Sequence, residues 1–553
     1  MKSDRLKPED RKEMHMEQII YYGGCIRTMD EKGTVEAVLT ADGIILAAGT
    51  REETEKAAEA GNRRRNAKIQ RIPLEGKTML PAFIDAHSHF SALANTLLQA
   101  DLGSAESFDD IRHILKEYAA NHQISVNGWI RGAGYDHNRL KERVHPDRMV
   151  LDEVFPDQPV MISHQSGHVG VFNTKAMELL GITEATPVPE GGTFGRKDGK
   201  LTGYMEENAF LKYMKEVPMA SMEEFMRAFE EAQKQYASHG ITTIQEGMMN
   251  SQLLPFYRML TEKKKLYLDV VVYADIRQRE QLKKALGEYR NGYRDHVRLG
   301  GYKIFLDGSP QSRTAWMRKP YQGEENGYCG YGTMSDEEVC EAIRTAFLDQ
   351  MQILAHCNGD AACEQYIRCY EKIRKEFPDQ NIRPVMIHAQ LLGKDQLRKV
   401  KELGIIPSFF VAHVYHWGEI HRKNFGDVRA GEISPCRSAE REGIRFTFHQ
   451  DTPVIPSDML ETVWCAVNRR TSAGTVLGAE ERISVEEALL AVTGNAAWQY
   501  GEDDKKGSIA EGKKADFVIL DRDPFQVNPE EIREIRVLET IREGKTVYRA
   551  EEK

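Results

Sequence analysis

Two histidines, His87 and His89, close an apolar run of the chain that begins at Leu80. Residues two apart on a β-strand point to the same side, so both imidazole rings can face one point in space. Neutral imidazole nitrogens are good ligands for first-row transition metals such as zinc. A His-x-His pair also occurs in strands that bind no metal, so further candidate ligands elsewhere in the chain are needed to indicate a metal site.

Four later runs, short and largely apolar, carry a further candidate ligand at or near their ends. The candidates are Lys303, His356, His388 and Asp451. These runs alternate with stretches of helical character, for example residues 336–351 and 359–377, and such alternation indicates parallel βαβ units. In a (β/α)8 TIM-type barrel the carboxyl ends of the strands meet at one face, where active sites are built. We therefore expect an α/β fold of this type, with the four side chains beside the histidine pair.

Longer segments around these residues match a known pattern. The segments are 81–89, 129–136, 166–168, 303–309, 312–315, 388–390, 451–454 and 507–516. Through them the chain resembles the amidohydrolase superfamily and, within it, the YtcJ-like (amidohydrolase 3) branch, which includes N-substituted formamide deformylases. The resemblance extends from about residue 19 to about residue 547. The chain differs from the family pattern at Ala82, where the family usually has glycine.

The resemblance implies a centre with two divalent metal ions, for which Zn²⁺ is expected. It assigns one ion to His87, His89 and Asp451, and the other to His356 and His388. Two dications about 4 Å apart repel each other by roughly 16 kcal/mol at an effective dielectric constant of roughly 20, so an anion must lie between them. In the family this anion is a carbamylated lysine, and Lys303 stands at the matching position.

The same resemblance implies hydrolysis of a C–N bond of an amide, a formamide or a cyclic amide, other than a peptide bond, by attack of a metal-bound hydroxide. Asp451 is the expected catalytic residue, because a carboxylate beside the metal can take a proton from the nucleophile and pass it to the leaving amine. Two alternatives stay open: a mononuclear deaminase of the superfamily, and a catalytically silent homologue that binds or regulates. Lys303 argues against the deaminase, because such enzymes generally lack the lysine of strand 4.

Each of these residues also has a purely structural interpretation. Lys303 could lie at a solvated strand edge, and Asp451 before Thr-Pro could cap a turn. Glu246, at the end of another apolar run, is a further candidate metal ligand. His168 and Arg313 are expected to contact the substrate, with a packed histidine and a salt bridge as the competing interpretations.

Composition favours a soluble enzyme with a small-molecule substrate. Hydrophobic residues make up 41% of the 553 residues and charged residues 29%, as in an ordinary globular protein. A net charge of -10 argues against a nucleic-acid partner, and no run of about 20 apolar residues is present that could span a membrane. Residues 1–16 are charged throughout, unlike a secretory signal, and the eight cysteines form no Cys-x-x-Cys pair. We therefore expect a cytoplasmic protein, and a homo-oligomer is compatible with the sequence.

A barrel alone does not account for the whole chain. The strand-like pieces in residues 18–80 and 500–553 are each too small to bury a core alone. We expect them to form one small composite β-sandwich beside a barrel of residues 81–499, with residues 1–17 as a tail. A segment of about residues 90–235 separates the histidine pair from the next strand, and we expect it to fold by itself as a wall or lid over the metals.

The sequence does not determine the substrate. Aromatic residues in the loops after strands 7 and 8 favour an apolar or aromatic substrate group, but the same residues could belong to the core. They are Phe409, Phe410, Tyr415, Trp417 and Trp464.

Overall fold

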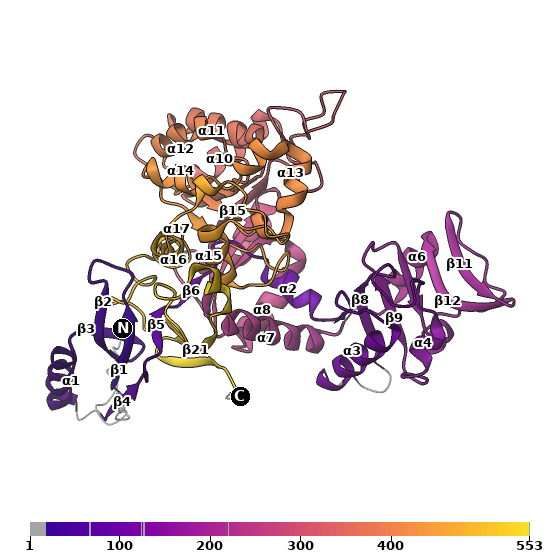
Figure 1. Cartoon of the computed structure of the whole chain (residues 1–553), viewed down its shortest axis with the longest axis horizontal. Coiled ribbons are helices and arrows are strands. Elements are labelled where there is room, and N and C mark those ends of the chain that lie inside the picture. The colour runs from indigo at the N-terminus through magenta and orange to yellow at the C-terminus, as the bar shows by residue number, and fades with distance from the viewer. Residues whose placement is uncertain (1–17, 66–67, 123, 125–127, 219, 552–553) are drawn as a thin grey trace, which may run out of the picture. The chain divides into compact units, whose positions relative to one another are not determined.

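The structure, a computed structural model, describes residues 18–551 except 66–67, 123, 125–127 and 219, so the expected tail lies outside the described residues. The chain divides into two compact units. The first consists of Met1–Ser91 and Gln233–Lys553, and the second of Ala92–Ala232. Figure 1 traces the chain from indigo at its N-terminus to yellow at its C-terminus.

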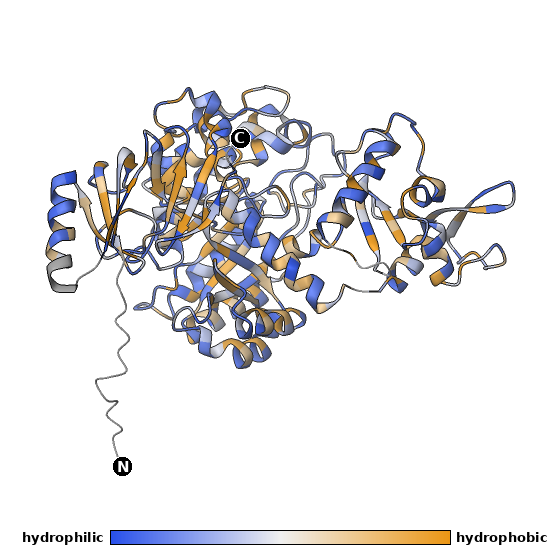
Figure 2. Cartoon of the chain, turned by 90° about the horizontal axis from the view of Figure 1, so that it is seen from below, coloured by the Kyte–Doolittle hydropathy of each residue, from blue (hydrophilic) through white to orange (hydrophobic). Residues whose placement is uncertain are grey.

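Eight strands form the main sheet of the first unit, and every adjacent pair in it is parallel. From one edge to the other they are β6 (Phe83–Ile84), β13 (Ile241–Met249), β14 (Asp269–Asp275), β15 (Val297–Phe305), β16 (Gln352–Cys357), β17 (Val385–His388), β18 (Ile406–Phe409) and β19 (Thr447–Phe448). The central strand β14 reads Asp-Val-Val-Val-Tyr-Ala-Asp and is buried along its whole length, as parallel strands covered on both faces are. Many strands of the chain are largely orange, the hydrophobic end of the scale, in Figure 2.

Helices follow the strands of the main sheet from β13 onward: those before β19 return the chain to the start of the next strand, and the last three come after β19. They are α8 (Leu254–Glu262), α9 (Arg279–Leu286), α10 (Asp336–Asp349), α11 (Asp360–Arg374), α12 (Leu397–Leu403), α13 (His413–Gly431), α14 (Cys436–Arg441), α15 (Met459–Asn468), α16 (Val485–Ala491) and α17 (Gly494–Gln499). Helix α10 begins where it does because Ser335 and Glu338 form a capping box, each side chain accepting the other's backbone N–H. None of the described helices has the length and apolar character that crossing a membrane would require.

The first and last strands of the main sheet are linked just beyond their carboxyl ends. The backbone N–H of His89 donates to the carbonyl of Thr452 at 2.8 Å, and the N–H of Asp451 donates to the carbonyl of His87 at 3.3 Å. The two histidines that follow β6 and the aspartate that follows β19 are therefore held side by side, although more than half the chain separates them.

A second sheet of the first unit combines strands from both ends of the chain (Figure 1). Its order is β22 (Lys545–Arg549), β21 (Val537–Arg542), β20 (Phe517–Leu520), β5 (Thr78–Pro81), β1 (Gln18–Arg27), β2 (Thr34–Ala41) and β3 (Ile44–Gly49), with β4 (Ile69–Pro73) also paired to β1. The two ends meet where β20 runs antiparallel to β5, with Val518 opposite Leu80. Helix α1 (Arg51–Arg65) places Ala58 against Ile20 and Leu39 of this sheet. A sandwich of two packed sheets in this region stays a prediction.

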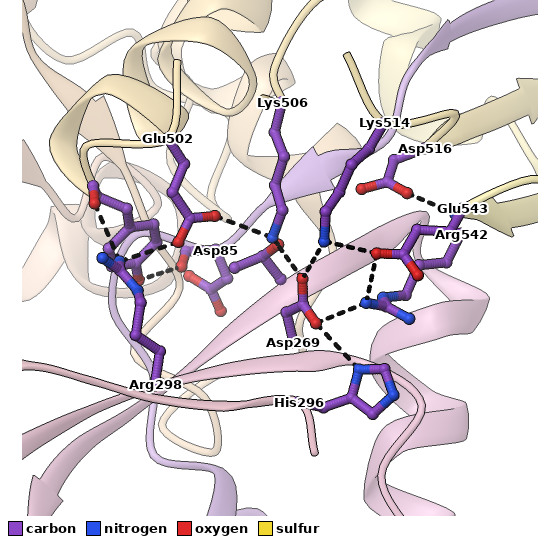
Figure 3. Close-up of polar contacts among 12 residues, drawn as sticks. Asp85, Asp269, His296, Arg298, Glu502, Lys506, Lys514, Asp516, Arg542 and Glu543 are labelled. Carbon is purple, nitrogen blue, oxygen red and sulfur yellow. Dashed lines mark hydrogen bonds and ion pairs between the residues drawn. The ribbon is translucent and has the colours of Figure 1, made fainter. Parts of the chain in front are cut away.

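A buried ionic cluster ties the C-terminal segment to the start of β14 (Figure 3). Asp269 lies 2.6 Å from Lys506 Nζ and 2.7 Å from Arg542 Nη2, and Lys514 Nζ is 3.3 Å away. Burial alone would raise the pKa of the Asp269 carboxyl, but Lys506 and the other neighbours hold this pKa well below its usual value. Buried charges need such partners, so the cluster locks the C-terminal segment onto the main sheet.

The second unit has its own sheet of six strands. Their order is β11 (Gly192–Lys197), β12 (Lys200–Glu207), β10 (Val169–Phe172), β9 (Val160–His164), β8 (Ile130–Tyr135) and β7 (Ala100–Asp101). Its helices are α3 (Phe108–Asn121), α4 (Arg148–Asp152), α5 (Thr174–Leu179) and α6 (Asn208–Glu216), and α2 (Phe90–Thr96) and α7 (Met222–Ser238) cross the two boundaries between the units. The unit has a core of its own around Leu115, Ile130 and Ile162. A role as a wall or lid stays a prediction.

Candidate metal centre

Three predicted ligands meet beyond the carboxyl ends of β6 and β19. Nε2 of His87 and Nε2 of His89 each lie 3.3 Å from Oδ1 of Asp451. The three side chains form a group whose ligand atoms all lie within 4.8 Å of one another. Two ligands held about 2.1 Å from a tetrahedral zinc ion lie roughly 3.4 Å apart, so this spacing suits a shared ion.

Asp451 is half-buried and available to bind a cation. Its Oδ1 has no hydrogen-bond partner of acceptable geometry among the described residues. Burial alone would raise the pKa of the carboxyl, but the interaction with His89 and other nearby groups lowers this pKa below its usual value. Its backbone has a φ of 55°, in the left-handed region that aspartate tolerates better than most residues. The turn aims an ionised carboxylate at the two histidines.

Lys303, near the end of β15, lies against the same group. Its Nζ is 3.2 Å from Nε2 of His87, and the residue is only 1% exposed. Burial lowers the pKa of Lys303 to about 7, although the carboxylate of Asp451 acts in the opposite direction. A substantial fraction of the amine is therefore neutral at neutral pH, which excludes the interpretation of Lys303 as a solvated edge residue.

His388 extends the cluster on the side of Asp451. Its Nε2 lies 4.0 Å from Oδ2 of Asp451, and its ring centre is 4.6 Å from that of His356. Its Nδ1 lies 3.1 Å from Nε2 of His449, whose own Nδ1 is 2.9 Å from the hydroxyl of Ser408. Burial, followed by the neighbouring His356, holds the pKa of His388 well below its usual value, and burial lowers the pKa of His449 to about 3. Both rings are neutral and can act as ligands or hydrogen-bond partners.

His356, near the end of β16, is oriented by a buried carboxylate. Its Nδ1 lies 3.2 Å from Oδ1 of Asp307, which also accepts the backbone N–H of Asn358 at 2.9 Å. A proton on Nδ1 donated to Asp307 leaves Nε2 as the ligand atom, the usual arrangement of a metal-binding histidine. The side-chain amide of Asn358 lies 3.3 Å from that Nε2.

His87 is oriented by Gln245 of β13. His87 Nδ1 lies 2.6 Å from Gln245 Oε1, while the amide nitrogen of Gln245 donates to the carbonyl of Ala86 at 2.8 Å. Because the amide nitrogen is committed to donating, the oxygen accepts, and His87 carries its proton on Nδ1. Nε2 of His87 therefore has a free lone pair directed toward Lys303 and Asp451.

Three of these supporting residues are absent from the sequence-based prediction: His449, Asp307 and Gln245. His449 lies two residues before Asp451, so a His-x-Asp reading of that run would have found it. Asp307 lies in the segment 303–309 that carries the family resemblance. Gln245 has no signal in the sequence, because only the pairing of β13 with β6 brings it to His87.

Three other predicted residues have partners away from this cluster. The carboxylate of Glu246 accepts the backbone N–H of Ser91 and the hydroxyl of Tyr257, each at 2.9 Å. Arg313 forms an ion pair of 2.8 Å with Glu324, and His168, in the second unit, is exposed and paired with Glu207 at 3.0 Å. A substrate contact by Arg313 or His168, and a metal bond to Glu246, stay predictions.

A cavity of about 690 Å³ lies beside Lys303. Its wall includes the apolar side chains of Met248, Ile304, Phe305 and Met334. None of the aromatic residues that the sequence suggested for the substrate lines this cavity. Phe409 and Phe410 are buried, and Phe410 packs at 5.3 Å against His449 of the cluster, so their contact with a substrate stays a prediction.

Comparison with known proteins gives a consistent result. The profile described as the amidohydrolase family matches residues 70–548. The chain is 29% identical over 551 residues to the amidohydrolase YtcJ of Bacillus subtilis, covering 96% of this chain and 99% of the relative. It is 27% identical to an N-substituted formamide deformylase of Arthrobacter pascens, covering 96% of this chain and 98% of that protein.

The fold agrees with these sequence matches. The structure resembles a metal-dependent hydrolase of Pyrococcus furiosus with a TM-score of 0.73 and 25% sequence identity, covering 92% of this chain and all of the other. With the family profile matched over most of its length, the protein belongs to the amidohydrolase family.

Proposed function

We propose that the protein is a metal-dependent hydrolase that cleaves a C–N bond of an amide, a formamide or a cyclic amide, other than a peptide bond. The observation that carries the proposal is the meeting of His87, His89 and Asp451 at 3.3 Å with Lys303 beside them. Similarity over 96% of the chain to a protein named N-substituted formamide deformylase supports the amide class. The cavity beside Lys303, whose wall combines apolar side chains with charged ones such as Arg277 and Glu338, supports a substrate group with an apolar part.

The donor set fits two divalent ions, with zinc as the expected metal. His87, His89 and Asp451 would hold one ion, and His356 and His388 the other. The free lone pair of His87 Nε2, the unpartnered Oδ1 of Asp451 and the neutral buried imidazoles are the features that suit cations. When bound, the ions would polarise the substrate carbonyl and lower the pKa of a water molecule toward about 7.

Lys303 is proposed to carry a carbamate between the ions. Its neutral Nζ attacks the carbon of CO2, an N–C bond forms, and one proton leaves to solvent, which converts the neutral amine into an anionic carbamate. A pKa of about 7 supports this step, because the protonated amine has no lone pair for it. The product carboxylate would neutralise part of the repulsion between two dications.

Asp451 is proposed to move the proton. Oδ1 faces His87 and His89, so Oδ2 is the atom that accepts a proton from the attacking water. It then gives this proton to the substrate nitrogen, which must be protonated to leave as an amine. The low pKa of the carboxyl keeps it in the accepting form at neutral pH.

Four further points belong to the same proposal. The eight parallel strands close as a (β/α)8 barrel, and the sheet built from both chain ends folds as a small β-sandwich beside it. The second unit, Ala92–Ala232, acts as a wall or lid, and the enzyme works in the cytoplasm. Backbone hydrogen bonds between the segments that follow β6 and β19 support the closure.

Anomalous diffraction from crystals grown with Zn²⁺, combined with a turnover assay on N-formyl and N-acetyl arylamines, tests the function. The proposal expects two peaks, one beside His89 and one beside His356, and release of the arylamine. One peak, with ammonia released from an amino-substituted heterocycle instead, would point to the mononuclear deaminase. No peak and no turnover would leave the silent homologue as the explanation.

A further inference from the structure

A second group of potential metal ligands lies in the second unit, apart from the residues of the proposed hydrolase. Strands β8 and β9 are parallel neighbours, with Tyr135 opposite His164 at their carboxyl ends. Asp136 and His137 follow β8 directly, and His164 is the last residue of β9. The carboxyl ends of parallel strands lie at one edge of a sheet, so the topology brings these three side chains together.

The distances within this group suit a single ion. Nδ1 of His137 lies 3.2 Å from Nε2 of His164, and Oδ1 of Asp136 lies 3.9 Å from the first atom and 3.8 Å from the second. Ligand atoms on a tetrahedral zinc ion are roughly 3.4 Å apart, so a small inward movement completes the geometry. The side chains are 17%, 29% and 10% exposed in the order Asp136, His137 and His164, so an ion can reach them from solvent.

The hydrogen bonds around His164 are compatible with either tautomer of its imidazole ring. Nδ1 of His164 lies 2.9 Å from the hydroxyl of Ser166 and 3.1 Å from the backbone N–H of Ser166. When Nδ1 accepts the N–H, the ring proton sits on Nε2 and is donated to His137. When Nδ1 donates to the hydroxyl instead, both Nε2 of His164 and Nδ1 of His137 have lone pairs free, and a cation can take the place of the shared proton.

We propose that Asp136, His137 and His164 bind one divalent first-row transition-metal ion, with Zn²⁺ as the representative. Two imidazoles and a carboxylate are a donor set that suits first-row transition-metal ions. Mg²⁺ and Ca²⁺ fit it less well, because they select oxygen ligands. The ion would cross-link the segments that follow β8 and β9. This proposal does not depend on the proposed hydrolase function, because none of the three ligands belongs to the catalytic cluster.

Neighbouring residues hold the ligands in place. The ring of His145 stacks on that of His137 with centroids 4.0 Å apart, and its Nδ1 is 3.1 Å from the hydroxyl of Tyr135. The backbone N–H of Asn138 donates to Oδ1 of Asp136 at 2.9 Å, and its side-chain amide is 3.2 Å from the same oxygen. The ion displaces this side-chain amide, and water fills the fourth position of the metal.

The test counts zinc in the full-length protein. Chelator-treated wild-type protein and the variant His164→Phe, which keeps a ring but has no nitrogen, are equilibrated with Zn²⁺, freed of excess metal and measured by mass spectrometry. We expect the variant to hold one zinc ion fewer per chain than the wild type. The matched control His113→Phe changes a histidine of the same unit whose side chain is 80% exposed and should hold as much zinc as the wild type.

Anomalous diffraction from wild-type crystals grown with Zn²⁺ gives a second measurement that does not depend on a variant folding. A peak bonded to His137 and His164 supports the proposal. Equal zinc content in His164→Phe and wild type, or no peak at this position while the catalytic centre is loaded, overturns it. Peaks here but none beside His89 would instead contradict only the proposed function.

Discussion

Gln245 orients His87 of the candidate metal centre, with 2.6 Å between Oε1 and Nδ1, although they lie 158 positions apart in the chain. Gln245 is itself fixed by donating to the hydroxyl of Tyr500 at 2.8 Å, and Tyr500 donates to the carbonyl of Asp85 at 2.7 Å. This buried chain of hydrogen bonds sets the tautomer of His87 and points its free nitrogen at Lys303. In the proposed metal centre, Gln245 would thus prepare His87 to bind a metal without touching the metal itself.

The variant Gln245→Leu should weaken metal binding without removing any ligand. His87 loses the acceptor for its Nδ1 proton, so its ring is free to rotate and to change tautomer. We expect the concentration of free Zn²⁺ that restores half-maximal turnover of chelator-treated enzyme to rise about 10–100-fold. Gln365→Leu is the matched control, because Gln365 is an equally buried amide that binds Met334 and Asp336 instead. Equal metal requirements in the two variants would contradict a positioning role for Gln245.

The variant Lys303→Ala should lose one ion at the catalytic centre and nearly all activity, because no carbamate can form between the metals. The cavity left by the side chain can admit a short carboxylate, so added acetate or propionate should restore part of the turnover. In Lys303→Met the side chain fills that cavity, and the same carboxylates should have no effect. Two ions and full turnover in Lys303→Ala would show that the bridge is wrong.

Carbamylation of Lys303 should depend on pH in a defined direction. Burial lowers the pKa of the amine to about 7, so the neutral form rises from about a tenth at about pH 6 to about nine-tenths at about pH 8. At a constant concentration of dissolved CO2 and of added Zn²⁺, the rate at which metal-free, CO2-depleted enzyme regains activity should therefore increase about tenfold between these values. A rate that keeps rising at the same slope toward about pH 10 would mean that Lys303 titrates as an ordinary lysine.

Much of the fold follows from local features of the sequence. The valine-rich run of β14 indicates a buried strand, and the capping box at Ser335 indicates the start of helix α10, each from only a few residues. The ligands His87 and His89 follow from the two-residue period of a strand. These signals require no knowledge of which segments pair.

The supporting residues could not be predicted in the same way, because their roles exist only after the strands are in register. Gln245 reaches His87 through the pairing of β13 with β6, and Asp307 reaches His356 through the pairing of β15 with β16. The cluster of His137 and His164 likewise depends on the pairing of β8 with β9. For Arg313 the sequence left both a substrate contact and a salt bridge open; the structure shows an ion pair with Glu324, and the substrate contact stays a prediction.

The variant Asp269→Asn should destabilise the protein far more than a surface charge change. It removes the carboxylate that Lys506, Lys514 and Arg542 share, and breaking a buried ion pair costs up to about 3–5 kcal/mol. Glu502 and Glu543 remain as partners of the three cations and moderate the loss. Urea unfolding measures the loss. Glu55→Gln breaks only the partly exposed pair with Arg71 and should cost about 0–1 kcal/mol.

The same aspartate predicts how stability responds to acid. Its pKa is depressed in the folded state, so its contribution is complete above the unfolded pKa of about 3.9 and is lost as the pH falls below that value. The difference in unfolding free energy between wild type and Asp269→Asn should therefore shrink below about pH 4. A difference that is constant across this range would show that the charge of Asp269 does not stabilise the fold.

The variant Asp451→Asn separates metal binding from proton transfer. The amide keeps the size of the side chain and an oxygen that can still face His87 and His89, so most of the bound metal should remain. It cannot accept a proton from the attacking water, so kcat for an N-formyl arylamine should fall by about 10²–10⁴-fold. The acidic limb of the pH–rate profile should change as well, because the carboxylate that titrates there is gone. Metal content and kcat measured on one preparation decide the matter: a variant with full metal and near wild-type kcat would make Asp451 a ligand alone, and His413, buried at 3.0 Å from His421, would be the next proton carrier to test.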